Sequence, residues 1–336
     1  QLGGIGYMTF SSFILLSNKK ELSKERTEVS QTVFSLPNNF KIDKFIKSVI
    51  VFTVILEFIG AIVLFTIFSS SNMKNPVWSA VFHSISAFCT AGFSLFNTSF
   101  EQFKNHFGLN LIISVLSFAG AIGFIVFVDL WRSISGKIQK ITLTSKIILK
   151  ASAILIIGAT TLIFITEPTI KNLSIIDRIY VSFFQAMTAS TTVGFNTLTI
   201  STMSKASLLI ITVLMVIGAS PSGTGGGIKT TSVTSFFGVM RSALKGDDDV
   251  YFLKVKIPHY RIQTAIATLA AYIFILMLGA YLLMLSENQN FLDILFEAAS
   301  ALGTVGLSMG ITDKLTEFGK LVITFLMFIG RLGPLT

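Results

Sequence analysis

One pattern occurs three times in this chain, as Phe82-His-Ser-Ile-Ser-Ala-Phe-Cys-Thr-Ala-Gly-Phe-Ser94, Phe184-Gln-Ala-Met-Thr-Ala-Ser-Thr-Thr-Val-Gly-Phe-Asn196 and Phe296-Glu-Ala-Ala-Ser-Ala-Leu-Gly-Thr-Val-Gly-Leu-Ser308. Aligned on the glycine near the end of each copy, the three share a Phe ten residues earlier and a Thr two residues earlier. A small apolar residue precedes each of these glycines, and Phe or Leu follows it. Three copies in phase are improbable by chance, so the pattern indicates a structural repeat.

The surroundings of the three copies are also alike. Each copy lies between two long apolar segments and follows a short polar or Pro-containing connection. The helical run before each Thr-x-Gly has about ten residues, too few to cross a bilayer. A half-helix inside a membrane is tolerated only where the irregular backbone after it is buried in protein or lines a water-filled cavity. The repeat therefore predicts re-entrant half-helices around a hydrated pathway.

The composition is that of an integral membrane protein. Of 336 residues, 52% are hydrophobic and only 13% are charged, which exceeds what a soluble core requires. Six stretches approach or exceed the roughly 20 apolar residues that cross the hydrocarbon core. They are 45–68, 109–131, 147–166, 206–240 with an interruption, 260–285 and 319–336. We therefore predict an all-α integral membrane protein of repeated helix, half-helix and helix units, in contact with the lipid bilayer.

The net charge of +9 indicates orientation rather than nucleic-acid binding. Lys and Arg residues concentrate in segments 18–44, 132–150 and 241–261, and the segments on the opposite side carry far fewer. Basic segments between spans face the cytoplasm. We therefore expect these three segments on the cytoplasmic side and no nucleic-acid partner. The single cysteine excludes an internal disulfide framework.

The Thr-x-Gly loops are suited to hold a dehydrated cation. A potassium filter replaces the water around the ion with rings of backbone carbonyls. Glycine permits positive φ, Thr offers a hydroxyl and a carbonyl, and the half-helix directs the negative end of its dipole at the ion. For a single copy, the competing interpretation is a C-terminal helix cap. We call segments 89–92, 190–194 and 303–306 the filter loops. The residues predicted to bind potassium are Cys89, Thr90, Ala91, Gly92, Ser190, Thr191, Thr192, Val193, Gly194, Gly303, Thr304, Val305 and Gly306.

The chain resembles the Trk/Ktr/HKT superfamily of cation transporters, and most of all the bacterial Ktr-type membrane subunit. The likeness rests on the three loops, on Gly218-Ala-Ser-Pro-Ser-Gly-Thr-Gly-Gly-Gly-Ile-Lys-Thr-Thr231 and on Phe328-Ile-Gly-Arg-Leu-Gly-Pro334. It implies four units around one pore with pseudo-fourfold symmetry, and filter glycines associated with potassium selectivity. It also implies a multi-pass protein of the bacterial plasma membrane. The partners it implies are a second copy, as a homodimer, and a cytosolic nucleotide-binding regulatory ring, with no organic cofactor in this chain.

A Gly-rich segment interrupts the fourth apolar stretch. Segment 218–227, which we call the gate loop, has one proline and five glycines, so a helix cannot persist through it. The resemblance implies that it is a mobile loop below the filter that gates permeation. A packed kink is the competing interpretation. A phosphate loop is excluded because Ile228, rather than glycine, precedes Lys229. The residues of the predicted gate are Gly218, Ala219, Ser220, Pro221, Ser222, Gly223, Thr224, Gly225, Gly226, Gly227 and Lys229.

Arg331 stands in the last apolar stretch, where an ionised group is expensive and usually faces a cavity or a partner. The resemblance places it on the pore side just below the filter, where its charge would raise a barrier to cations. The alternative is an arginine that snorkels to the helix end. The other polar residues in apolar stretches, Glu57, His83, Asp129 and Glu297, are expected to have packing roles.

The expected organisation follows the repeat. Residues 1–17 are expected to be the remnant of the outer helix of a first unit, 18–44 a cytoplasmic connector, and 45–133, 134–246 and 247–336 the second, third and fourth units. Gly3-Gly4-Ile-Gly6 resembles Ala119-Gly120-Ala-Ile-Gly123, which follows a filter loop. The first filter loop is therefore expected upstream of Gln1, and the last unit is expected to be cut short at Thr336.

These observations predict selective uptake of potassium, controlled by the gate loop and by a cytosolic subunit. A sodium-permeable or sodium-coupled transporter of the same architecture is the alternative, which serine in place of a filter glycine would have favoured. An enzyme would need a nucleophile and base or metal ligands clustered at membrane depth, and we find none in the sequence. A scaffold would not need three buried irregular loops, whose backbone groups are costly to satisfy.

Overall fold

The computed structural model describes residues 42–71, 73–135, 141–247, 249–253 and 255–333, so segment 1–17 and most of segment 18–44 lie outside the described residues. The helices are α4 (Ile42–Ser70), α5 (Pro76–Phe88), α6 (Phe107–Ile122), α7 (Phe124–Ile134), α8 (Leu143–Thr166), α9 (Ile175–Thr191), α10 (Lys205–Val216), α11 (Thr230–Lys245), α12 (His259–Ser286), α13 (Phe291–Leu302) and α14 (Glu317–Leu332). Two short strands, β1 (Tyr251–Phe252) and β2 (Val255–Lys256), pair in antiparallel fashion.

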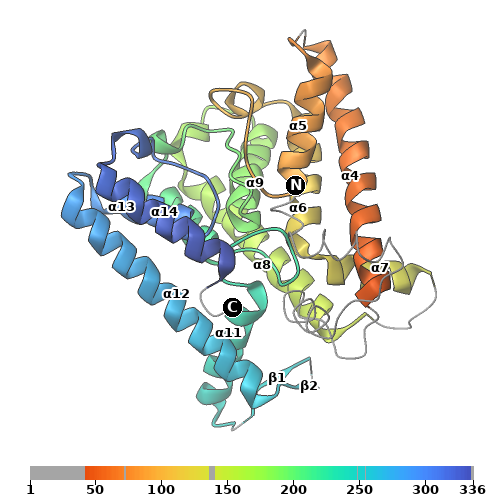
Figure 1. Ribbon diagram of the computed structural model, residues 1–336, viewed down its shortest axis with the longest axis vertical. Coiled ribbons are helices and arrows are strands. Elements are labelled where there is room, and N and C mark those ends of the chain that lie inside the picture. The colour runs from red at the N-terminus through yellow and green to blue at the C-terminus, as the bar shows by residue number, and fades with distance from the viewer. Residues whose placement is uncertain (1–41, 72, 136–140, 248, 254, 334–336) are drawn as a thin grey trace.

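The described helices repeat a simple order, in which a long helix is followed by a shorter one and then by another helix or pair of helices (Figure 1). The shorter helix α5 contacts α4 and α6, α9 contacts α8 and α10, and α13 contacts α12 and α14. Each of α5, α9 and α13 is therefore held between the two helices that flank it in the chain. The predicted all-α architecture of helix, half-helix and helix units is confirmed.

Three described helices are long and apolar enough to cross a membrane: Ser48–Ser70, Leu143–Thr166 and His259–Ser286. Helices α6 and α7 meet at an angle of 97°. They form a fourth crossing if this bent pair is counted as one broken span. The apolar stretch 109–131 is therefore not one straight helix. The break occurs at Gly123, whose φ of 93° is incompatible with a helix and is rarely adopted by any other residue.

The outer faces of the long helices carry large exposed apolar side chains. The exposed fraction is 66% for Phe58 on α4 and 67% for Phe274 on α12. Soluble monomers rarely expose contiguous apolar surface of this kind, whereas the acyl chains of lipids are as apolar as these side chains. The exposed rings therefore agree with helices that face the lipid.

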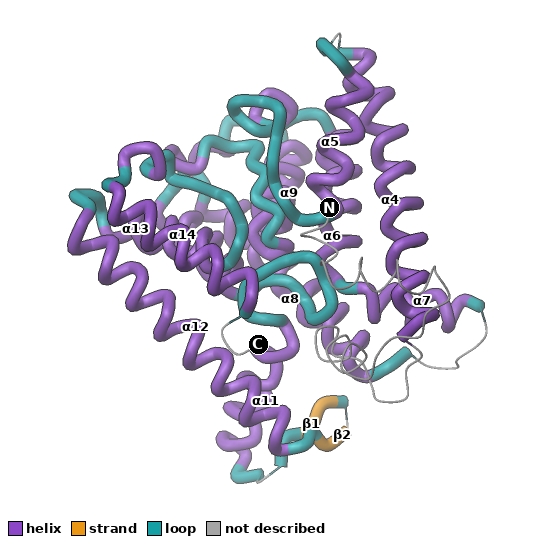
Figure 2. Tube along the Cα trace, viewed as in Figure 1, coloured by secondary structure: helices purple, strands orange, loops and turns teal. Residues whose placement is uncertain are grey.

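Helix α9 lies near the centre of the molecule (Figure 1). In α9 every residue from Phe184 to Thr191 is buried. The largest cluster of buried apolar side chains joins α9 to α10, α12 and α13. In Figure 2 irregular backbone, drawn in teal, also runs through the middle of the molecule near α9 and α14. Irregular backbone at such depth is the feature that the repeat predicts.

Two local expectations need correction. Helix α9 has 17 residues, longer than the predicted half-helix, because Ser174 caps it within the expected polar connection and its Oγ accepts a hydrogen bond from the Asp177 N–H at 3.1 Å. The connector after α11, which the charge pattern predicts on the cytoplasmic side, contains the β1–β2 hairpin, which the sequence did not predict. An ion pair of 2.6 Å between Lys256 Nζ and Asp249 Oδ2 holds it.

Candidate functional site

The threonine of each Thr-x-Gly ends its half-helix with a left-handed residue. The φ angles are 49° at Thr90, 57° at Thr192 and 51° at Thr304. Each threonine N–H donates to the carbonyl three residues earlier, and the next N–H donates to the carbonyl five residues earlier, at distances from 2.8 to 3.2 Å. This is the Schellman type of helix cap, in which glycine is usual. The cap interpretation is thus locally correct, but it does not explain why threonine occupies the position three times.

The glycine two residues later also has positive φ in all three loops, with 67° at Gly92, 86° at Gly194 and 91° at Gly306. The residue between them has negative φ, so the sign of φ alternates along each loop. Such alternation can turn successive carbonyls toward the same side of the chain. Stacked carbonyls on one side are what a cation without its water requires.

The filter loops touch one another through their glycines. A Cβ at Gly92 would collide with the carbonyl oxygen of Val193, and one at Gly194 would collide with the carbonyl oxygen of Val305. At Gly306 no atom of the described residues lies within 4 Å of the corresponding position. The three loops therefore stand in sequence along an arc, with Gly92 and Gly194 each lying against the next loop.

Not every predicted potassium ligand lies in irregular backbone. Ser190 and Thr191 belong to the last turn of α9, and the Thr191 hydroxyl donates to the Met187 carbonyl of its own helix at 2.8 Å. Gly303 keeps helical backbone with φ of −74°. The structure thus concentrates the unusual backbone in the Thr-x-Gly residues of each loop.

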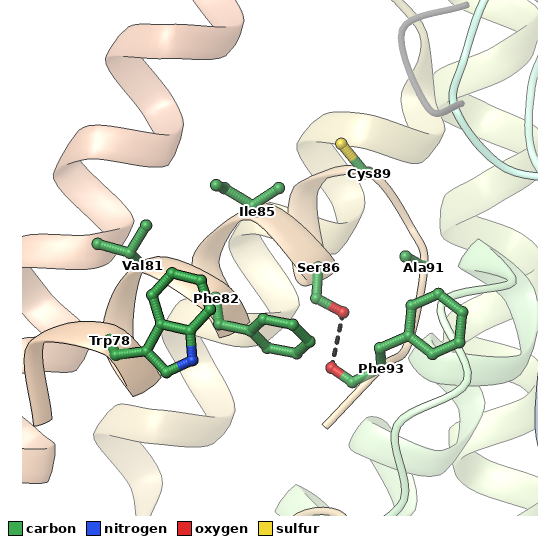
Figure 3. Close-up of a pocket in the computed structure, with 8 residues that line it drawn as sticks. All are labelled: Trp78, Val81, Phe82, Ile85, Ser86, Cys89, Ala91 and Phe93. Carbon is green, nitrogen blue, oxygen red and sulfur yellow. Dashed lines mark hydrogen bonds between the residues drawn. The ribbon is translucent and has the colours of Figure 1, made fainter. Parts of the chain in front are cut away.

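A hollow of about 220 Å³ lies beside filter loop 89–92. Figure 3 shows its lining, where the side chains of Trp78, Phe82 and Ile85 on α5 lie near Ala91 and Phe93, and the Ser86 hydroxyl donates to the Phe93 carbonyl at 2.8 Å. Phe93 is 70% exposed. One side of filter loop 89–92 is therefore open, at the other end of the arc from Gly306.

The gate loop is bound to the break between α6 and α7. The Ser220 N–H donates to the Ala121 carbonyl at 3.1 Å, and the Thr224 N–H donates to the Gly120 carbonyl at 3.0 Å. In the other direction, the Phe124 N–H donates to the Ser222 carbonyl at 3.3 Å. Backbone groups freed by one broken helix are thus satisfied by the other irregular segment.

All three cap threonines contact the gate loop. The Thr192 Oγ1 accepts from the Gly226 N–H at 2.9 Å, and the Thr90 Oγ1 lies 3.1 Å from the Thr224 Oγ1. A Cβ at Gly226 would collide with the Thr304 Oγ1. The gate loop therefore lies directly against the N-terminal ends of the three Thr-x-Gly segments, which explains the threonines that helix capping alone leaves unexplained.

Two cationic side chains hold carbonyls of the gate loop. Lys229 Nζ donates to the Gly225 carbonyl at 2.9 Å, and Arg331 Nη1 donates to the Thr224 carbonyl at 3.1 Å. Arg331 is thus joined to the loop rather than directed only to the end of α14. The arrangement places two cationic side chains against the backbone of the gate loop, which itself contacts the filter loops.

Two glutamates outside the apolar stretches, to which the sequence analysis gave no role, each connect the end of a long helix to the N-cap of another helix. Glu167 follows α8 and accepts from the N–H of Ser204, the N-cap of α10, at 3.0 Å. Glu287 follows α12 and accepts from the N–H of Thr316, the N-cap of α14, at 3.1 Å. A glutamate directly after a long apolar helix in two units was the available signal.

The polar residues that were expected to have packing roles make structural contacts. Asp129 accepts hydrogen bonds from the Thr142 N–H at 3.2 Å and from the Ser145 hydroxyl at 2.6 Å, at the start of α8. Glu57 lies 3.7 Å from the Cys89 sulfur. Within the described part of the chain, no group of three or more His, Cys, Asp and Glu side chains could hold a metal ion.

Comparisons with known proteins agree on one family. The family model described as TrkH, cation transport protein, matches residues 1–336. Ktr system potassium uptake protein B of Bacillus subtilis (strain 168) is 33% identical over 341 residues, which cover 100% of this chain and 76% of that protein. Potassium/sodium uptake protein NtpJ of Enterococcus hirae is 32% identical over 346 residues, 100% of this chain and 76% of that protein. The crystal structure of the potassium transporter TrkH from Vibrio parahaemolyticus has the same fold, with a TM-score of 0.71, 19% identity and coverage of 98% of this chain and 67% of that one.

Proposed function

Because this chain belongs to the TrkH family of cation transport proteins, we propose that it takes up potassium selectively through a pore lined by its filter loops. One observation carries the proposal: Thr90, Thr192 and Thr304 adopt the same left-handed conformation, and a glycine with positive φ follows each of them by two residues. Repeated loops of this kind present backbone carbonyls, the ligands that a potassium filter uses.

Sodium is the second candidate ion. One relative is named as a potassium/sodium uptake protein, whereas others are named as potassium uptake proteins. All three described filter loops keep glycine at the position after Ala91, Val193 or Val305. We therefore favour potassium, with sodium passage or sodium coupling as the alternative that the experiment below distinguishes.

The arc of loops needs one more wall to enclose an ion. Gly92 and Gly194 each lie against the next loop, whereas Gly306 has free space beside it and Phe93 is exposed. We propose that a fourth loop of the same kind closes the ring between Gly306 and Ala91, and that residues 45–133, 134–246 and 247–336 act as three units of the pore.

The gate loop would block the pore from below. Its contacts with all three cap threonines support this role, because an ion that leaves the filter toward the cytoplasm would have to displace it. The hydrogen bond of Arg331 to the Thr224 carbonyl would keep the loop in place, and its charge would oppose cations. Release of the loop would therefore open the path.

The cytoplasmic connectors would carry regulation. Segment 241–261 is basic and contains the β1–β2 hairpin after α11, and α11 follows the gate loop directly. A subunit bound there would pull on α11 and so on the gate loop. Relatives named as components of a Ktr system support a cytosolic regulatory subunit, and we propose a homodimer on a nucleotide-binding ring.

The test is potassium and sodium uptake by potassium-depleted cells that express the full-length protein, with Gly194→Ser as the variant. A side chain at Gly194 would push on the Val305 carbonyl, so we expect the preference for potassium over sodium to fall by about tenfold or more. Gly158→Ser is the matched control, because no neighbouring atom lies within 4 Å of a Cβ at that position of α8. Unchanged selectivity in Gly194→Ser with normal membrane expression would refute the filter.

A further inference from the structure

The residue nine positions before each filter glycine is polar although the helix around it is apolar. These residues are His83 on α5, Gln185 on α9 and Glu297 on α13. Each follows the shared phenylalanine of the repeat, and the exposed fractions of the side chains are 0%, 0% and 6%. A buried polar side chain needs a partner, and each of the three finds one in the backbone just beyond its filter glycine.

All three side chains face the amide N–H three residues after the glycine. The Leu95 N–H donates to His83 Nε2 at 3.2 Å, and the Met309 N–H donates to Glu297 Oε1 at 2.9 Å. With its amide turned to satisfy both of its polar atoms, Gln185 accepts from the Thr197 N–H at 3.1 Å. The equivalent hydrogen bond therefore recurs at the same position in every described unit.

The three side chains differ chemically, and only their acceptor is common. His83 Nδ1 lies 2.7 Å from the Ser79 carbonyl, which accepts and so requires the proton on Nδ1. Nε2 is then left as a lone-pair acceptor, as the Leu95 N–H requires. An imidazole, an amide oxygen and a carboxylate thus each accept a hydrogen bond from the equivalent backbone N–H. The shared requirement is therefore a hydrogen-bond acceptor rather than a charge.

Each side chain also meets a hydroxyl in the same stretch after the glycine. His83 Nε2 lies 3.1 Å from the Ser94 Oγ, and the Ser308 hydroxyl donates to Glu297 Oε1 at 2.6 Å. The Thr197 Oγ1 lies 3.2 Å from the Gln185 amide. In each unit the side chain therefore makes two contacts with the second and third residues after the glycine, or both with the third. These contacts hold the backbone where it leaves the filter loop.

On the basis of the filter proposed above, we propose that His83, Gln185 and Glu297 are positioning residues that anchor the outer end of each filter loop and thereby set its preference for potassium over sodium. Without the acceptor, the amide N–H three residues after the glycine loses its hydrogen-bond partner, and the loop can shift until this N–H finds another one. The carbonyls of the Thr-x-Gly residues lie three to five residues before that amide. Since selectivity depends on how the carbonyls are held around the ion, a released loop discriminates less.

The experiment compares variants that keep an acceptor with variants that lack one, in full-length protein, by potassium and sodium uptake in depleted cells. Glu297→Met and Gln185→Met remove the acceptor at similar side-chain length, and Glu297→Gln keeps it. His83→Phe removes it within a ring of aromatic side chains, with centroids 4.7 Å from Phe96 and 5.2 Å from Phe100, where a phenyl ring packs readily. His83→Gln restores an acceptor, and Ser182→Ala is the control, because it changes a buried residue of α9 whose hydroxyl has no hydrogen-bond partner among the described residues.

We expect each acceptor-lacking variant to lower the potassium preference by about tenfold, and each acceptor-keeping variant to retain most of it. Gly194→Ser is measured in parallel. Loss of selectivity in Gly194→Ser without any loss in His83→Phe and Glu297→Met at normal membrane expression would overturn the anchoring role and leave the filter standing. Unchanged selectivity in Gly194→Ser would overturn the filter, and the anchoring role with it. Equal losses in Glu297→Gln and Glu297→Met would show that charge, and not the acceptor, matters, which would also overturn the proposal.

Discussion

Thr192 combines a left-handed φ of 57° with a β-branched side chain, a pairing that proteins seldom tolerate. Its hydroxyl accepts a hydrogen bond from the Gly226 N–H, and this contact compensates for the unfavourable backbone conformation. Thr192→Val keeps the shape and removes the acceptor, so we expect a lower unfolding temperature in detergent, since an unpaired buried N–H costs about 1–3 kcal/mol. Thr192→Ser keeps the hydroxyl and should unfold close to the parent temperature. Equal unfolding temperatures for the two variants would contradict this account.

Glu287 predicts how stability depends on pH. Burial raises the pKa of its carboxyl, but hydrogen bonds from Thr316 and Ser286 outweigh burial and bring the pKa below its ordinary value. A carboxyl with a lowered folded pKa stabilises the protein above its unfolded pKa of about 4.3, and that stability is lost as pH falls through the folded pKa. Because this loss occurs below about pH 5, we expect Glu287→Gln to reduce the drop in unfolding temperature between about pH 5 and pH 2. Glu317→Gln, at an exposed residue, is the control and should leave the drop unchanged.

Among helices and loops, the break between α6 and α7 is the element that the apolar pattern could not reveal. An apolar run of this length predicts one straight crossing, and the glycines within it are compatible with close packing as well as with a bend. The bend is stabilised by the gate loop, whose Ser220 and Thr224 N–H groups donate hydrogen bonds to the carbonyls of Ala121 and Gly120. These partners are about a hundred residues away in the sequence, beyond the reach of any local pattern.

Gly123→Ala tests this element. The φ of 93° disfavours any side chain, and a Cβ there would collide with the Pro221 carbonyl of the gate loop. We expect a lower unfolding temperature and an altered basal rate of potassium uptake, because the gate loop must move. Gly158→Ala on α8 has no neighbour within 4 Å and should stabilise by up to about 1 kcal/mol through helix propensity. A Gly123→Ala protein as stable as Gly158→Ala would show that the break is not needed.

For the protein as a whole, the charge asymmetry predicts which ends of the helices face outward. Cys89 is the single cysteine of the chain and is buried, so labelling can start from Cys89→Ala. Lys171, after α8, is expected outside, and Lys245, at the end of α11, is expected in the cytoplasm. A membrane-impermeant maleimide added to intact cells should label Lys171→Cys and spare Lys245→Cys. Labelling in the reverse pattern would invert the orientation and the direction of the proposed gate.

From the sequence alone follow the membrane location, the three half-helix units and the Thr-x-Gly loops, because apolar length, charge placement and a phased repeat are local properties of the chain. The family resemblance added a role for the gate loop and for Arg331. Those roles and the potassium ligands stay predictions until the variants are measured.

Only the tertiary structure decided which groups meet. The Thr224 hydroxyl lies 3.2 Å from the Phe88 carbonyl across 136 positions of sequence, and Gly92 lies against the Val193 carbonyl of the next loop. The tertiary structure also places His83, Gln185 and Glu297 beside the equivalent backbone amide of each unit. A single sequence does not indicate that an imidazole, an amide and a carboxylate share this function. Such contacts depend on how the helices pack, and packing joins residues that no local periodicity connects.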